Sequence, residues 1–407
     1  MPRSLVHFTF LFFTLTALSG VWMRLYPFHS FSLTYTNILH AHSHLAIIGW
    51  AFLAVFVIFL ATYWSTIQQK KQAKMIAWTL LIISIGMFGA FLYQGYGIYS
   101  IIMSTIHIFV EYWAAIFMYR QLKVKRDAPK SGLLFIKASL LTLFISSIGP
   151  FALGYISANG LKDSYFFDMA IYFYLHFQYN GWLTLFLLGM FIMIIDREKI
   201  ALPPRLVKAA FWIYFLSLFP GYFLSVLWVD LGVLVQILVV EGSIGQWIGI
   251  MLLLFACRRV WKSLLQQYSK SIVLLLGLTL LLLFAKSTME LGLISPGLAE
   301  LVYDTRSIVI GYLHLTLLGF VSIFIITQYR MVGIIRSSKF FHVGFILFFV
   351  GLLLNEIILF IQGLLQWLQL PSLSFLTEGL LIASVFLLVG IVIKWISFLK
   401  QQEQFEA

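Results

Sequence analysis

The sequence predicts an all-α polytopic membrane protein with about twelve transmembrane helices in a single domain, residues 1–407. Composition is the first observation that predicts it: 61% of the residues are hydrophobic, 10% are charged, and the mean hydropathy is +0.98. Soluble domains carry roughly 25% charged residues. The second observation is the length of the apolar stretches, because about 20 such residues cross a bilayer as a helix. These stretches also lack the alternating pattern of barrel strands.

The predicted spans follow one another through loops too short for a separate domain. They lie near residues 5–26, 39–63, 75–95, 98–119, 133–157, 166–194, 207–228, 231–256, 271–292, 306–329, 340–366 and 373–399. A transporter of this size can contain an internal repeat, but no convincing internal similarity is evident by inspection.

The distribution of positive charge supports this topology. Lys and Arg gather at the termini and in the loops after even-numbered spans, the exceptions being Arg24, Lys162, Lys286 and Arg306. By the positive-inside rule, this asymmetry predicts that both termini are cytoplasmic. The expected location is a bacterial inner membrane, with the lipid bilayer as the surrounding partner. The net charge of +12 is therefore explained by membrane topology and does not indicate a nucleic-acid partner.

Four even-numbered spans, which all run in the same direction, carry histidine at about the same depth. Lipid cannot solvate an imidazole, so an intramembrane histidine is a functional candidate. A layer of such residues predicts bound haem or metal. The single Cys257 excludes a CxxC metal site and a covalent c-type haem motif. The histidines of this layer are His40, His42 and His44 in the second span, His107 in the fourth, His176 in the sixth and His314 in the tenth.

Within the second span, helical geometry separates the three histidines. At 100° per residue, His40 and His44 share one face and His42 points to the opposite one. His44 lies about a turn deeper than His40, which makes His44 the stronger candidate ligand. His40 is a candidate metal ligand near the membrane interface. The alternative is that one or two of these side chains simply bond to interfacial water or to a carbonyl.

The sixth span carries a polar ladder on one face, from Asp168 through Tyr172 and His176 to Asn180. An imidazole that binds metal usually has its second nitrogen fixed by another group. Tyr172, Tyr179 or Asn180 are suited to fix His176, which is therefore a candidate ligand for haem or metal. The alternative is a buried polar network that holds helices together.

The tenth span places His314 between Gly311 and Gly319, which leave space for a flat macrocycle or for close helix packing. Arg306 lies two turns toward the outer surface, where it is suited to pair with haem propionates. Arg24 lies at a similar depth in the first span. Both arginines are alternatively ordinary interfacial residues.

Two further pairs are spaced one helical turn apart. His107 and Glu111 are placed to chelate a metal, or else to form a private ion pair or proton relay. Lys286 and Glu290 are spaced for an internal ion pair. That pair fits a proton or water path, and it fits plain bundle cohesion equally well.

Twelve spans, cytoplasmic termini and histidines in the second, sixth and tenth spans resemble subunit I of the haem–copper oxidases and nitric oxide reductases. In length and motif the chain is more similar to the NnrS-type haem and copper membrane proteins. The residues that carry the likeness are His40-Ala41-His42 followed by Gly49, the stretch from His314 to Gly319, and the His107–Glu111 segment. This last motif belongs in the sixth span in the family. The seventh span here has no histidine pair, so the copper site that reduces dioxygen is not expected to be complete.

The resemblance implies an inner-membrane protein that binds one b-type haem, with His44 and His314 as axial ligands. His176, with His42 or with His107 and Glu111, would form a second haem, copper or non-haem iron site. The function implied is electron transfer, or respiration or stress response involving nitric oxide or dioxygen, with a quinol or a redox protein as electron donor. Two alternatives stay open: a secondary transporter or metal permease that uses intramembrane His and Glu, and a redox-silent accessory protein on the same scaffold.

Overall fold

The computed structural model describes residues 3–123, 130–229 and 231–406, and these residues form helices without any strand. Within these ranges, twelve helical segments are long and apolar enough to cross a membrane, which confirms the predicted polytopic helical protein. They run Ser4–Leu25, Tyr35–Tyr63, Lys70–Gln94, Ile98–Lys123, Lys130–Ala158, Tyr165–Arg197, Pro204–Val226, Val233–Arg259, Lys270–Gly292, Arg306–Met331, Lys339–Trp367 and Phe375–Gln401.

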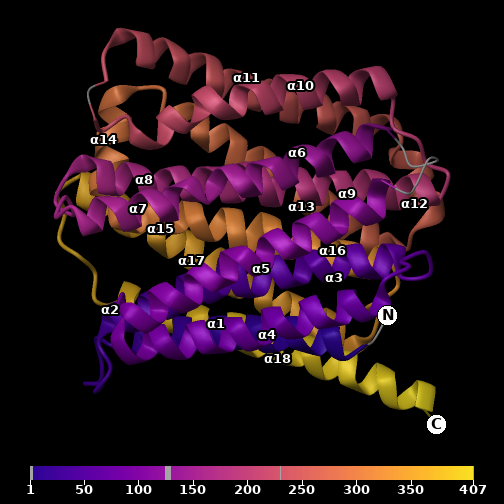
Figure 1. Ribbon diagram of the computed structural model, residues 1–407. Helices are drawn as coiled ribbons and strands as arrows, with labels where there is room; N and C mark the ends of the chain where they lie inside the picture. Colours follow the sequence, from indigo (N-terminus) through magenta and orange to yellow (C-terminus); the bar gives the residue numbers. More distant parts are fainter. Residues whose placement is uncertain (1–2, 124–129, 230, 407) are drawn as a thin grey trace. The chain divides into compact units, whose positions relative to one another are not determined.

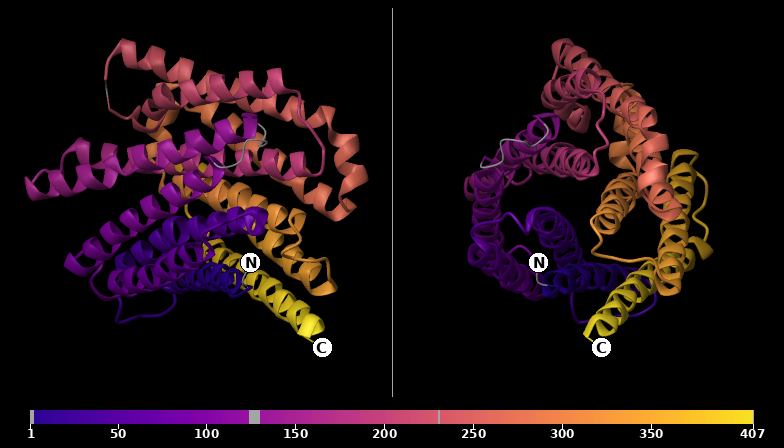
Figure 2. Two further views of the ribbon diagram at one scale, coloured as in Figure 1. Left: turned by 45° about the vertical axis from the view of Figure 1, so that its right-hand side comes forward. Right: turned by 90° about the vertical axis from the view of Figure 1, so that its right-hand side faces the viewer.

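The chain divides into two compact units, each described by itself. Unit 1 comprises Met1–Gln121 and Val332–Ala407, the indigo-to-purple and orange-to-yellow ends of the chain in Figure 1. Its elements are α1 (Ser4–Leu25), α2 (Tyr35–His44), η1 (Leu45–Ala51), α3 (Phe52–Tyr63), α4 (Lys70–Gln94), α5 (Ile98–Lys123), α17 (Lys339–Trp367) and α18 (Phe375–Glu406). The second span, formed by α2, η1 and α3, packs against α1 and α4. The long helices α17 and α18 pack together, and α18 also contacts α1 (Figure 2).

Unit 2 comprises Leu122–Met331. Its elements are α6 (Lys130–Ser146), α7 (Ile148–Ala158), α8 (Tyr165–His176), η2 (Phe177–Leu183), α9 (Thr184–Arg197), α10 (Pro204–Gly221), η3 (Tyr222–Val226), α11 (Val233–Arg259), α12 (Trp261–Gln267), α13 (Lys270–Gly292), α14 (Pro296–Asp304), α15 (Arg306–His314), η4 (Leu315–Val321) and α16 (Ser322–Met331). The sixth span (α8, η2, α9) packs against α6, while α13 packs against α11, η4 and α16.

Local sequence explains where several helices begin or break. The Thr34 hydroxyl accepts a 3.3 Å bond from the Asn37 amide at the start of α2, and Ser338 caps α17 in the same way. Such caps satisfy amides that have no partner within the helix. The predicted span 133–157 is interrupted at Ser147, between α6 and α7. Pro150 follows three residues later, and it has no N–H to donate to the preceding turn.

The contact between α10 and α11 depends on the absence of a side chain at Gly242. A Cβ at this position would lie 2.7 Å from the backbone carbonyl carbon of Pro220. We expect Gly242→Val to lower the free energy of unfolding by about 1–3 kcal/mol, as is typical of overpacking. Gly154, where a Cβ would meet nothing within 4 Å, provides the matched Gly154→Val control. Unfolding of purified protein in mixed micelles measures both variants, and equal stabilities would contradict the expectation.

Candidate functional site

Three spans change their helical geometry directly after a histidine. His44 ends α2, His176 ends α8 and His314 ends α15. Each is followed by 7 residues of π-helix before the α-helix resumes. Such segments are rare and frequently mark functional sites. The three histidines therefore hold equivalent positions in the second, sixth and tenth spans.

The hydrogen bonds that close the three π-helical segments are also equivalent. In each span, the amide eight residues after the histidine donates to the carbonyls three and five residues after it; the donors are Phe52, Thr184 and Ser322. The Thr184 hydroxyl donates a further 2.6 Å bond to the Tyr179 carbonyl, and the Ser322 hydroxyl a 2.7 Å bond to Leu317. Two of the three spans thus reinforce the same wide turn with the same side-chain contact.

A short sequence pattern accompanies this geometry. Each histidine is followed, after four residues, by glycine and a large aromatic residue: Gly49-Trp50, Gly181-Trp182 and Gly319-Phe320. The pattern recurs once in every four spans. We did not expect internal similarity from inspection of the sequence. The three spans do share a repeat, but it is confined to the histidine and the Gly-aromatic pair that follows it.

In unit 1, His42 points toward α1, as its helical face predicts. Its Nδ1 lies 2.9 Å from the Thr16 carbonyl oxygen and 3.2 Å from the Ser19 hydroxyl. Because a carbonyl can only accept, Nδ1 carries the proton, and the lone pair of the neutral ring is on Nε2. Nε2 has no hydrogen-bond partner within the described part of the chain. This arrangement is typical of a histidine that binds a metal through Nε2.

The surroundings of His42 leave room for its ring and add a positive charge. A Cβ at Gly20 would lie 3.4 Å from Cε1 of His42, so glycine permits this close approach to α1. Arg24, one turn further along α1, is near enough to interact electrostatically with His42. A ligand with a carboxylate near His42 would therefore meet a cation.

His44 lies on the opposite face of the second span and contacts α4 and the turn after it. Its ring stacks on Phe91 with centroids 4.2 Å apart, and its Nε2 lies 2.7 Å from the Tyr96 hydroxyl. His40 contacts the same tyrosine ring at 4.4 Å. Tyr96 lies between two spans, and its side chain is 57% exposed. The protonated hydroxyl can donate to His44, so ligation through Nε2 of His44 requires Tyr96 to turn away.

His107 and Glu111 contact each other, as their spacing predicts. Nδ1 of His107 lies 3.1 Å from a Glu111 carboxylate oxygen, and Nε2 lies 3.0 Å from the Ser84 hydroxyl of α4. All three side chains are buried. Both imidazole nitrogens therefore contact protein groups. Of the alternatives that the sequence offered for this pair, the observed contact is the ion pair between His107 and Glu111.

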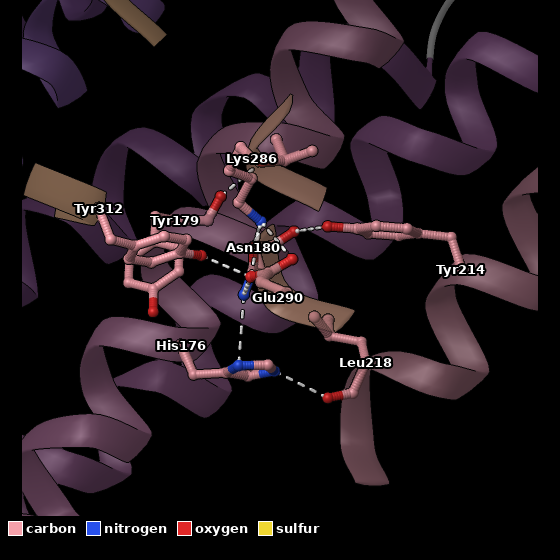
Figure 3. A network of polar contacts seen from close by, with 9 residues as sticks. His176, Tyr179, Asn180, Tyr214, Leu218, Lys286, Glu290 and Tyr312 are labelled. Carbon is pink, nitrogen blue, oxygen red and sulfur yellow. Dashed lines mark hydrogen bonds and ion pairs between the residues drawn. The ribbon is translucent and has the colours of Figure 1, made fainter. Parts of the chain in front are cut away.

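In unit 2, His176 is held from both sides (Figure 3). Its Nε2 lies 2.9 Å from the Leu218 carbonyl oxygen of α10, so Nε2 carries the proton. The Asn180 amide nitrogen lies 3.3 Å from Nδ1. Asn180 is in turn fixed by a 2.9 Å bond from the Tyr214 hydroxyl to its backbone oxygen. Asn180 is thus the residue that fixes His176, and ligation through Nδ1 would require Asn180 to move.

Asn180 also joins His176 to a charged pair in α13 (Figure 3). Nζ of Lys286 lies 3.0 and 3.1 Å from the two carboxylate oxygens of Glu290 and donates to the Asn180 side-chain oxygen. The Asn180 amide nitrogen lies 3.3 Å from Glu290. The Tyr312 hydroxyl donates to Oε1 of Glu290, the same oxygen that the Asn180 amide contacts. A continuous set of polar contacts therefore runs from His176 to a buried ion pair.

His314 and Arg306 lie at the two ends of α15 in unit 2. The eight residue steps from Arg306 to His314 span about 12 Å of helix. His314 is partly exposed, and Gly311, one turn before it, is buried. The predicted role of Arg306 in pairing with propionates at the outer end of this span stays a prediction.

Among the described residues, no group of three or more His, Cys, Asp or Glu side chains is placed to hold a metal ion by itself. The sites described above therefore consist of single imidazoles and of pairs. No protein-family model matches the sequence, and no curated protein matches it.

Proposed function

We propose that this chain is a haem-binding membrane protein of the haem–copper oxidase-like class, most similar to NnrS-type proteins. It would lie in a bacterial inner membrane with both termini cytoplasmic. One b-type haem would be held with His42 as an axial ligand in unit 1. When bound, such a group supplies one-electron chemistry at a potential set by its ligands and by nearby charges.

One observation carries this proposal: the Thr16 carbonyl holds Nδ1 of His42, and Nε2 has no hydrogen-bond partner among the described residues. Thr16 and Ser19 fix the tautomer and the direction of the ring. Gly20 allows the ring to approach α1, and Arg24 supplies a cation for a propionate. His42 fits an axial ligand better than His44, whose Nε2 is already bonded to Tyr96.

The repeated π-helical segments support a functional role for the histidine layer as a whole. A π-helical segment after His44, His176 and His314 places each imidazole beside irregular backbone, and such segments are frequent at functional sites. His314 stays a candidate haem ligand within unit 2, on the basis of the sequence. The electron donor would be a quinol or a redox protein.

A second function, a proton-coupled secondary transporter, is favoured by the Lys286–Glu290 pair. Charged residues inside transmembrane segments commonly mark ion or proton pathways. Here the pair is connected through Asn180 to His176. Protonation of Glu290 would therefore change the hydrogen bonds of Asn180 and, through them, those of the His176 imidazole.

Purified protein distinguishes the two functions. We expect the full chain, isolated in detergent, to show the Soret and α bands of b-type haem in a reduced-minus-oxidised spectrum, together with bound iron. The same preparation in proteoliposomes tests pH-gradient-driven uptake of a divalent metal. Folded protein that lacks a Soret band after haem supplementation would overturn the haem proposal. Metal uptake by that haem-free protein would establish the transporter instead.

A further inference from the structure

Unit 2 contains an open groove at the end of α11, outside the histidine layer. The groove encloses about 440 Å³ between α11, α12 and α13. Leu254, Leu281 and Phe284 are among the apolar residues that line it. Its volume lies in the range of roughly 300–1,000 Å³ typical of sites for small ligands. An apolar chain would lie along this groove with one side open to the surroundings.

One end of the groove is aromatic. Trp261, the first residue of α12, lines it, and a Cβ at Gly277 of α13 would lie 3.4 Å from the indole ring. Glycine at 277 therefore lets the ring lie close against α13. Tryptophan is enriched at the level of lipid headgroups, and Trp261 lies two residues after the end of the span Val233–Arg259.

The same end of the groove is positively charged. Arg258 is the charged side chain among the lining residues, and it has no hydrogen bond or ion pair with the described residues. Lys262 is exposed one turn away, whereas Arg259 lies over the Phe255 ring at 4.8 Å. An unpaired guanidinium at the end of a span is suited to bind a phosphate.

We propose that this groove binds an acidic phospholipid, with an acyl chain along Leu254, Leu281 and Phe284 and the headgroup phosphate at Arg258. Charge complementarity selects this occupant. Phosphatidylcholine carries the same phosphate but would also bring its choline cation close to Arg258 and Lys262, whereas a quinone ring would find few polar partners among the lining residues. Basic pockets between transmembrane helices are known to hold acidic headgroups.

Native mass spectrometry of the delipidated full-length protein tests this proposal. The probes are phosphatidylglycerol and phosphatidylcholine with identical acyl chains. We expect selective binding of phosphatidylglycerol, and Arg258→Gln should lower its affinity roughly fivefold, the effect of one basic residue near an anionic lipid. Arg259→Gln is the matched control, because Arg259 is directed to Phe255 and should change affinity less.

The apolar part of the groove has its own test. Leu281→Trp places a large ring in the groove from a position that is 59% exposed, and should block binding of phosphatidylglycerol. Leu274→Trp, on the same helix but outside the groove and 74% exposed, is the control. Thermal melting confirms that each variant is folded. Equal binding of the two lipids, or equal losses in the paired arginine variants, would overturn the proposal, and so would equal losses in the paired tryptophan variants.

Discussion

The His42→Ala protein is expected to lose the b-type haem spectrum while it remains folded. The imidazole Nε2 is the proposed axial ligand, and alanine offers no donor atom in its place. The loss should exceed tenfold in haem affinity, since disturbing even groups that only orient a ligand costs about 10–100-fold in metal affinity. Reduced-minus-oxidised spectra at equal protein concentration measure it. External imidazole, which fits the vacated space, should restore part of the Soret band.

Two matched variants make this result specific. His44→Ala removes the imidazole bonded to Tyr96, and should keep the haem with an altered spectrum. His176→Ala removes a histidine whose two nitrogens are both engaged by protein groups, and should keep the haem but lower stability. A full haem spectrum in His42→Ala, together with its loss in His44→Ala, would transfer the ligand role to His44.

The spans could be predicted from the sequence because a helix that crosses a bilayer needs mainly sufficient length and apolar side chains. The order of the twelve spans and the opposite faces of His42 and His44 follow from these demands and from helical periodicity. The π-helical segments do not, because helical projection assumes 3.6 residues per turn. The signal that reveals them is the recurrence of histidine, four residues and Gly-aromatic, at Gly49, Gly181 and Gly319.

The partners of the candidate residues were harder to predict than the residues themselves. Spacing along one helix was enough for the His107–Glu111 and Lys286–Glu290 pairs, which form as expected. The carbonyls of Thr16 and Leu218, which fix the tautomers of His42 and His176, are backbone atoms on other helices. Because every residue has a backbone carbonyl, the sequence does not indicate which carbonyl accepts the hydrogen bond from each histidine. Tertiary packing alone decides it.

The Glu290→Leu protein is expected to lose about 3–5 kcal/mol of stability, the usual cost of leaving one member of a buried ion pair without its partner. The Lys286 side chain is only 2% exposed, and Glu290 supplies both of its carboxylate contacts. The substitution also removes the acceptor of the Tyr312 hydroxyl. Equilibrium unfolding in mixed micelles measures the change. Glu300→Leu, at an exposed carboxylate of α14 in the same unit, is the control and should stay within about 0.5 kcal/mol.

The double variant Lys286→Met with Glu290→Leu separates charge pairing from simple loss of packing. Removing both charges leaves neither member of the pair as an unpaired ion, and replacing buried pairs by apolar residues is often neutral. We therefore expect the double variant to be more stable than Glu290→Leu alone. The resulting coupling energy should lie within the range of about 0.5–3 kcal/mol found for residues in contact. Additive losses from the two substitutions would show that the pair does not act as a unit. A double variant that keeps its stability but loses haem or transport would assign the pair to function rather than to bundle cohesion.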